Sequence, residues 1–162
     1  EIGSGLVGSE MCIRDRNDDE LAIFRRRQVG IIYQFYNLIP ILNVEENMAI
    51  PMELDGRKVE KAQMDDMLLR LGLTERRTHL PNELSGGQQQ RTSIGRALIT
   101  RPSIVLADEP TGNLDTKASN EIMHLLKTSN RELNQTIIMI THNMELAKAA
   151  DRTIMIEDGK IR

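Results

Sequence analysis

The chain contains three short apolar runs, and these limit the folds that it can adopt more than any other feature of the sequence. They read VGIIYQ (29–34), SIVLADEP (103–110) and TIIMITHN (136–143). Unbroken runs of Ile, Val, Leu and Met are typical of strands buried on both faces of a parallel sheet. Parallel strands need long crossover connections, which are usually helices. The sequence therefore predicts an α/β fold with a parallel sheet flanked by helices.

Segments with helical spacing or helix-capping residues lie around these runs. We expect a helix capped by Asn17 or Asp18, a helix ended by Gly72, and a helix opened by Pro81 and LSGG that runs through Gln88 to Thr100. In ranges, the expected helices are 17–28, 44–48, 57–71, 88–100, 116–133 and 144–151, followed by a strand and turn over 152–161. We therefore expect an α-helical subdomain over about 36–100 and a core part over 101–162.

The second apolar run ends in two acidic residues, Asp108 and Glu109. The carboxyl edge of a parallel sheet is where such folds bind ligands. One acid there can hold Mg²⁺, usually through water, and the next can orient and deprotonate an attacking water. Acids also end strands as solvated turns, so this pair alone does not define a site.

The sequence LSGGQ, residues 84–88, opens one of the expected helices. Its glycines let the backbone approach an anion closely, and the hydroxyl of Ser85, the free N–H groups and the helix dipole all favour phosphate. A flexible cap is the alternative. Five specified residues ahead of an amphipathic helix favour the phosphate interpretation.

These motifs resemble those of the ATP-binding cassette (ABC) ATPases. LSGGQQQR resembles the family's signature motif, and IVLADEP its Walker B strand. GNLD (112–115) resembles the D-loop, ITHN contains a residue like the switch histidine, and IIYQFYNLIP a residue like the Q-loop glutamine. The resemblance covers residues 17–162. YNLIP, VEEN and LADEPTGNLD look most like the group that serves lipoprotein release, macrolide-type efflux and antimicrobial-peptide export.

The resemblance implies a P-loop NTPase fold of ABC type and a homodimer of ATPase domains that holds two ATP molecules between its subunits. One subunit's signature motif would touch the γ-phosphate of the ATP on its twin, through Ser85, Gly86, Gly87 and Gln88. Asp115 would link the two sites across the dimer.

The resemblance also implies the catalytic roles. Asp108 would support Mg²⁺, Glu109 would act as the general base for water, and His142 would contact the γ-phosphate. Gln34 would reach the Mg²⁺ and the water, and would report the nucleotide state to an integral-membrane permease subunit. ATP and Mg²⁺ are thus the implied cofactors. The implied location is the cytoplasm, peripheral on the inner face of the cell membrane.

Each of these residues has a structural alternative. Gln34 alone is a strand-end residue, His142 a structural histidine after a strand, and Asp115 a helix N-cap. His79 and His124 are expected on the surface without a role. The functional interpretation depends on the motifs occurring together.

The first 16 residues do not fit the family pattern. Gly3 and Gly8 have the spacing of a phosphate-binding G-x-x-x-x-G-K-[ST] loop, but Ser9 and Glu10 stand where Lys and Ser/Thr belong. Residues 6–16 match an in-frame translation of an adapter used in transposase-based sequencing libraries. Our hypothesis is that residues 1–16 are non-native, which a different nucleotide string in the raw read would disprove. The Walker A loop and early strands would then be missing, making 17–162 a partial domain.

Two other functions share these motifs. A soluble ABC-type ATPase that acts on DNA or ribosomes is one, and a regulatory cell-division cassette is the other. Chromosome-maintenance types need a long coiled coil between Gln34 and Leu84, where none fits. The net charge of −3 gives no global field for nucleic acid, so no nucleic-acid partner is expected. Glu109 and His142 argue against an inactive cassette. The leading prediction is the ATP-hydrolysing subunit of a bacterial ABC transporter that powers export or extraction through its permease.

The missing loop makes a prediction about these 162 residues. Without the Walker A lysine, no positive charge faces the β- and γ-phosphates, so the isolated polypeptide should bind ATP poorly or not at all and hydrolyse none. Calorimetric titration with Mg-ATP checks this. Saturable binding at low micromolar ATP would contradict it.

Overall fold

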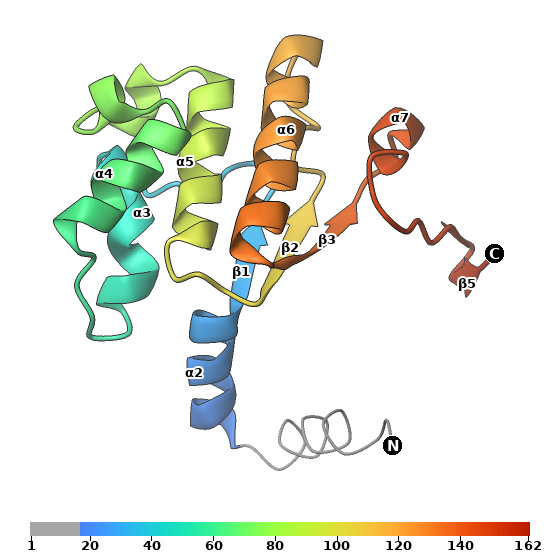
Figure 1. The fold of residues 1–162 in the computed structure, drawn as a ribbon, viewed down its shortest axis with the longest axis horizontal. Coiled ribbons are helices and arrows are strands. Elements are labelled where there is room, and N and C mark those ends of the chain that lie inside the picture. Colours follow the sequence, from blue (N-terminus) through green and yellow to red (C-terminus); the bar gives the residue numbers. More distant parts are fainter. Residues whose placement is uncertain (1–16) are drawn as a thin grey trace.

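A computed structural model describes residues 17–162 of the chain. Its centre is a three-stranded parallel sheet in the order β1-β2-β3 (Figure 1). The strands are β1 (Val29–Ile32), β2 (Ile104–Asp108) and β3 (Thr136–Ile140). All three lie in the predicted apolar runs, so the predicted parallel sheet is confirmed. The N-terminal segment 1–16 lies outside the described residues, and the adapter hypothesis stays a prediction.

Helices precede, connect and follow these strands. In chain order they are α2 (Asp18–Gln28), α3 (Val44–Glu53), α4 (Lys61–Arg70), α5 (Gly86–Leu98), α6 (Thr116–Leu133) and α7 (Met144–Ala147). Two 3₁₀ turns, η1 (Thr74–Arg76) and η2 (Pro81–Glu83), lie between α4 and α5. A short antiparallel hairpin of β4 (Ile156–Glu157) and β5 (Lys160–Ile161) follows α7. In Figure 1, α3, α4 and α5 form a group beside the sheet, and α6 lies over it.

Several predicted boundaries were wrong. Residues 57–60 precede α4 instead of belonging to it, and Pro81 opens η2, while α5 begins only after Ser85. The helix predicted over 44–48 continues to Glu53 with Pro51 inside it. Proline lacks the N–H that would bond the carbonyl four residues earlier, and a short helix tolerates that loss near its end. Gly72 has a φ of 63°, and it ends α4 as predicted.

The expectation that both faces of the sheet are buried was also wrong for the described residues. Side chains alternate between a buried face, with Ile32, Val105 and Ala107, and an open face. The open face carries Ile31, Leu106, Ile138 and Ile140, which are 38–65% exposed. Adjacent strand residues point to opposite faces, so helices on one side can cover only alternate positions.

The buried face joins the helical group in one apolar core. Met48, Leu68, Leu73, Ile94 and Leu98 are almost fully buried there. Close approach of α5 to the first strand depends on Gly30, where an added Cβ would lie 2.5 Å from the carbonyl oxygen of Ala97. A larger side chain would therefore push the helix away from the sheet. Gly30 thus fixes the position of α5 against the strand that leads to Gln34.

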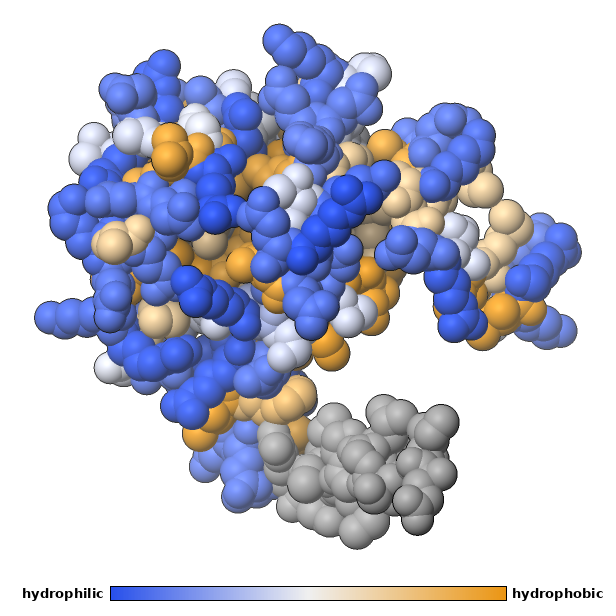
Figure 2. Space-filling view, in the orientation of Figure 1, coloured by the Kyte–Doolittle hydropathy of each residue, from blue (hydrophilic) through white to orange (hydrophobic). Residues whose placement is uncertain are grey.

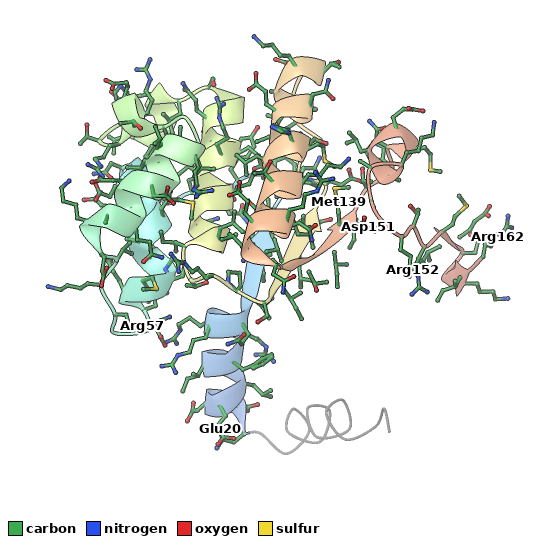
Figure 3. All side chains as sticks on the ribbon, in the orientation of Figure 1. Glu20, Arg57, Met139, Asp151, Arg152 and Arg162 are labelled. Atoms are coloured by element: carbon green, nitrogen blue, oxygen red, sulfur yellow. The ribbon has the colours of Figure 1, made fainter. Side chains whose placement is uncertain are left out.

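Ionic contacts join α2 to the end of α3. The carboxylate of Asp55 is 2% exposed and accepts hydrogen bonds from Nε of Arg27 at 2.9 and 3.0 Å. Arg57, labelled in Figure 3, pairs with the same carboxylate at 2.6 Å. Burial opposes ionisation, but the hydrogen bonds and charges of Arg27 and Arg57 outweigh it and lower the pKa of Asp55. Arg27 therefore stabilises the fold by joining α2 to the turn after α3.

The C-terminal hairpin is exposed. Ile154, Met155, Ile156 and Ile161 are 49–76% exposed, and Figure 2 shows apolar surface at this end of the molecule. Among residues 17–162, no helix combines the length and the apolar character needed to cross a bilayer.

A buried amide organises the loop between the first strand and α3. Asn47 is fully buried, and its Oδ1 accepts from the backbone N–H of Ile39 at 2.7 Å. Its Nδ2 donates to the carbonyls of Ile39, Leu42 and Asn43 at 2.7–3.1 Å. Among these groups, the N–H of Ile39 and the carbonyl of Leu42 have no other hydrogen bond within the described residues, so they depend on this side chain.

Replacing Asn47 should unfold this loop. Asn47→Ala leaves the N–H of Ile39 and the carbonyl of Leu42 without these partners, and we expect the full-length protein to lose about 1 to 3 kcal/mol of unfolding free energy. Urea denaturation measures the loss. Asn120→Ala, on the exposed side of α6, is the control, and it should change stability by less than about 0.5 kcal/mol. Equal stability of the two variants would contradict the assignment.

Candidate functional site

The strand register places the predicted catalytic residues at one edge of the sheet. Ile32 lies opposite Ala107, and Asp108 opposite Ile140. Parallel strands all end at the same edge. The segments that follow the strands therefore emerge together, and they carry Gln34, Glu109 and His142.

Glu109 leaves the sheet in an unusual backbone conformation. Its φ is 43°, in the left-handed region that residues with a side chain rarely adopt. Its backbone N–H donates to the carbonyl of Ile140 at 3.0 Å, and its own carbonyl accepts from the N–H of Gly112 at 3.0 Å. These bonds hold the sharp turn that points the carboxylate at the segment after β3.

Both oxygens of the Glu109 carboxylate are hydrogen-bonded. Oε1 accepts from the backbone N–H of His142 at 2.8 Å and lies 2.7 Å from its Nδ1. Oε2 accepts from the hydroxyl of Thr141 at 3.2 Å. The Glu109 side chain is 17% exposed, whereas that of His142 is 83% exposed. The carboxylate is thus held in a fixed orientation, and the ring of His142 extends into solvent.

The contact with Glu109 constrains the histidine chemically. An ionised carboxylate only accepts hydrogen bonds, so Nδ1 of His142 must carry the proton in this pair. A neutral ring then leaves Nε2 as an acceptor, and only the imidazolium form can also donate from Nε2. In this arrangement, a bond from Nε2 to an anion requires the charged ring.

Asp108 and Gln34 are the predicted magnesium ligands. Asp108 is exposed at the end of β2, and no hydrogen bond to its carboxylate is present within residues 17–162. Gln34 is half-buried beside Gly112, where an added Cβ would lie 2.8 Å from Nε2 of the glutamine. A free carboxylate and an amide oxygen are hard oxygen donors, which suit Mg²⁺. The residues present therefore fit this ion.

The signature residues open α5. Ser85 is its N-cap, and its Oγ accepts from the N–H of Gln88 at 3.4 Å, while Oε1 of Gln88 accepts from the N–H of Ser85 at 2.9 Å. Gly86 lies close to the side chain of Tyr36, because a Cβ added to this glycine would be 3.0 Å from the Tyr36 hydroxyl. Gly87 would place a Cβ 3.5 Å from that of Ala118. Half-buried glycines thus let the start of α5 pack against neighbouring segments.

Asp115 is the N-cap of α6, where its Oδ1 accepts from the N–H of Ala118 at 2.8 Å. The structural alternative for Asp115 therefore holds. Its predicted role across a dimer stays a prediction.

His79 contacts Arg76 at 2.9 Å and His124 is exposed on α6. Within the described residues, no hydrogen bond joins Ser85 or Gln88 to Glu109 or His142.

Sequence reasoning missed Thr141, Gln90 and Arg96. Arg96 donates to the carbonyls of Tyr36 and Asn37 at 2.7 and 2.5 Å. Both carbonyls belong to residues with positive φ, 61° and 49°. Burial raises the pKa of the Tyr36 phenol and lowers the pKa of Arg96. For Gln90, the available signal was a polar residue at a buried position of an amphipathic helix.

Comparison with known proteins decides the family. A family model described as ABC transporter matches residues 10–112, more than half of the chain. The chain belongs to the ABC transporter family. The motifs that predicted this assignment lie at the sheet edge and at the starts of α5 and α6, so the ABC type of α/β fold is confirmed.

Curated ABC relatives share 40–46% identity. The lipoprotein-releasing system ATP-binding protein LolD of Cytophaga hutchinsonii is 44% identical over 90% of this chain and 67% of its own length. The ABC transporter ATP-binding protein YtrE of Bacillus subtilis is 46% identical over 90% of this chain and 64% of its own. The macrolide export protein MacB of Bdellovibrio bacteriovorus is 45% identical, with 23% of its length covered. The chain therefore spans about two thirds of the length of LolD and YtrE.

A solved cassette has the same fold. The dimeric structure of the ATP-binding cassette MJ0796, in a post-hydrolysis state with ADP and Pi, superposes with a TM-score of 0.79. It is 39% identical and matches 91% of this chain and 66% of that one. The sheet and helices described here therefore belong to an ABC ATPase cassette.

Ser85 and Asp115, the N-caps of α5 and α6, make a paired prediction. Ser85→Ala removes the acceptor for the Gln88 N–H, and should cost about 1 kcal/mol of helix stability. Hydrogen exchange in the full-length protein should accelerate at Gln88 and not at Ala118. Asp115→Ala, the matched control, should give the reverse pattern. Unchanged exchange at Gln88 would show that the cap does not hold α5.

Proposed function

We propose that the full-length protein is the ATP-binding and ATP-hydrolysing subunit of a bacterial ABC transporter. The observation that supports this most is the carboxylate of Glu109, held through both oxygens by Thr141 and His142 beside the free carboxylate of Asp108. A general base must be held in hydrogen-bond reach of the water that it activates.

In the proposed reaction, Glu109 accepts the proton of the water that attacks the γ-phosphate. His142 contacts that phosphate and stabilises the charge that develops during transfer, where positioning and electrostatics supply most of the catalysis. Asp108 and Gln34 would hold Mg²⁺, which would neutralise phosphate charge when bound. Catalysis therefore depends on side chains that the sheet edge gathers from all three strands.

The proposed active unit is a homodimer. Ser85, Gly86, Gly87 and Gln88 contact the γ-phosphate of the ATP bound to the twin subunit, and Asp115 links the two sites. The start of α5 suits this role, because its first N–H groups favour an anion. MJ0796 is a dimeric cassette with 39% identity, which supports the same assembly here.

We also propose an integral-membrane permease as the partner, with the ATPase peripheral on the cytoplasmic face of the membrane. The similarity to LolD and MacB supports export or extraction, as in lipoprotein release or macrolide efflux. Phe35, which follows Gln34, is 71% exposed, and Ile41, later in the same loop, is 83% exposed, which supports permease docking between Gln34 and Asn47. Docking there would link the permease to the nucleotide through Gln34.

Replacing the base tests the proposal. In the full-length protein with its native N-terminal segment, Glu109→Gln should lower ATP turnover by roughly a hundredfold or more, because the water loses its proton acceptor. The variant should accumulate as a long-lived ATP-bound dimer, visible by gel filtration with labelled nucleotide. Glu75→Gln, on the exposed turn η1, should keep wild-type turnover. Undiminished hydrolysis by Glu109→Gln would overturn the assigned roles.

A further inference from the structure

The two segments that carry Gln34 and Glu109 are joined by a short turn. The N–H of Gly112 donates to the carbonyl of Glu109 at 3.0 Å. The next residue, Asn113, donates from Nδ2 to the carbonyl of Gln34 at 3.1 Å. A single turn therefore bonds both to the residue proposed as general base and to the residue proposed as magnesium ligand. We name the bond from Asn113 to Gln34 the outer contact, because Asn113 is exposed.

A second amide joins the same two segments from inside. Gln90 is fully buried on α5, and its Nε2 donates to the carbonyl of Pro110 at 2.6 Å and lies 3.4 Å from the carbonyl of Tyr33. Pro110 follows Glu109, and Tyr33 precedes Gln34. We name this pair of bonds the inner contact. Within the described residues, Oε1 of Gln90 has no hydrogen-bond partner. All the side-chain hydrogen bonds of this buried residue are therefore made by its amide nitrogen.

The side chain of Gln34 fits closely against this turn. A Cβ on Gly112 would lie 2.8 Å from Nε2 and 3.2 Å from Cδ of Gln34. The glycine therefore gives the amide room beside the turn. Because the fit is close, a displaced turn would also move the amide of Gln34.

We infer that Gln90 and Asn113 are positioning residues that fix the Gln34 segment relative to the Glu109 turn; this inference rests on the proposed function. Neither residue touches the reacting atoms. Gln90, which is buried, bonds the carbonyls of Tyr33 and Pro110, next to Gln34 and Glu109. Asn113, which is exposed, joins the Glu109 turn to the carbonyl of Gln34 itself. Gln90 also belongs to the helix that Ser85 begins. A shift of α5 on binding the twin's ATP therefore reaches Gln34 and Glu109 together.

Two variants of the full-length protein test the inference. Asn113→Asp replaces an exposed donor with a carboxylate that faces the Gln34 carbonyl, and Gln90→Met keeps the buried shape while removing the inner contact. Loss of one hydrogen bond corresponds to a fall in kcat of roughly threefold to tenfold. We expect this fall for each variant, an unchanged ATP dissociation constant, and a higher Mg²⁺ concentration for half-maximal rate. A wild-type kcat in either folded variant overturns the inference.

The control makes the same chemical change elsewhere. Nδ2 of Asn130 donates to the carbonyl of Gln135 at 2.6 Å at the end of α6, far along the chain from the turn. Asn130→Asp should leave kcat and Mg²⁺ dependence at wild-type values. An equal fall in kcat for Asn130→Asp would show a general effect of the substitution and overturn the inference. If Gln90→Met does not fold, Asn113→Asp decides the outcome.

A double-mutant cycle separates positioning from simple stability. If Asn113 acts through Gln34, then Asn113→Asp should lower kcat no further in a Gln34→Ala background. Additive losses would overturn the inference. Glu109→Gln is measured alongside. Full hydrolysis by Glu109→Gln means that the proposed function has failed, whereas an inactive Glu109→Gln with normal Asn113→Asp means that only this inference has failed.

Discussion

The parallel register of the three strands is the constraint on which the site depends. Ile32 pairs with Ala107 and Asp108 with Ile140, so the three strands end within one residue of each other. A slip of one residue would turn every side chain of a strand to the other face and would carry the following segment out of alignment. The backbone bond from Glu109 to Ile140 extends this register by one residue beyond the sheet. The geometry of the acid and the histidine is therefore decided by strand pairing.

The sequence was a good guide to what local chemistry determines. Unbroken apolar runs revealed the strands, and the capping residues Asn17 and Asp115 marked helix starts that the structure confirms. The motif residues at the sheet edge could be predicted because their position follows from the end of each strand. The resemblance to the ABC ATPases assigned Glu109 and His142 to one site, and they lie within hydrogen-bond distance.

Other features depend on tertiary contacts that no local pattern encodes. Gln90 is one of several glutamines in a row, and only the packed structure shows that it is buried against Pro110 and Tyr33. The hydroxyl of Thr141 has a partner only because β2 and β3 are neighbours. The open face of the sheet was missed for a related reason. An apolar run shows that a side chain prefers burial, but not which element covers it.

The backbone of Glu109 has a consequence for how this position can vary. Its left-handed conformation costs a residue with a side chain about 1 to 2 kcal/mol, a cost that glycine does not carry. Stability alone would thus favour glycine at this turn, whereas the proposed reaction requires the carboxylate. A glycine at this turn would therefore relieve the backbone strain, and it would also remove the carboxylate that we propose as the general base.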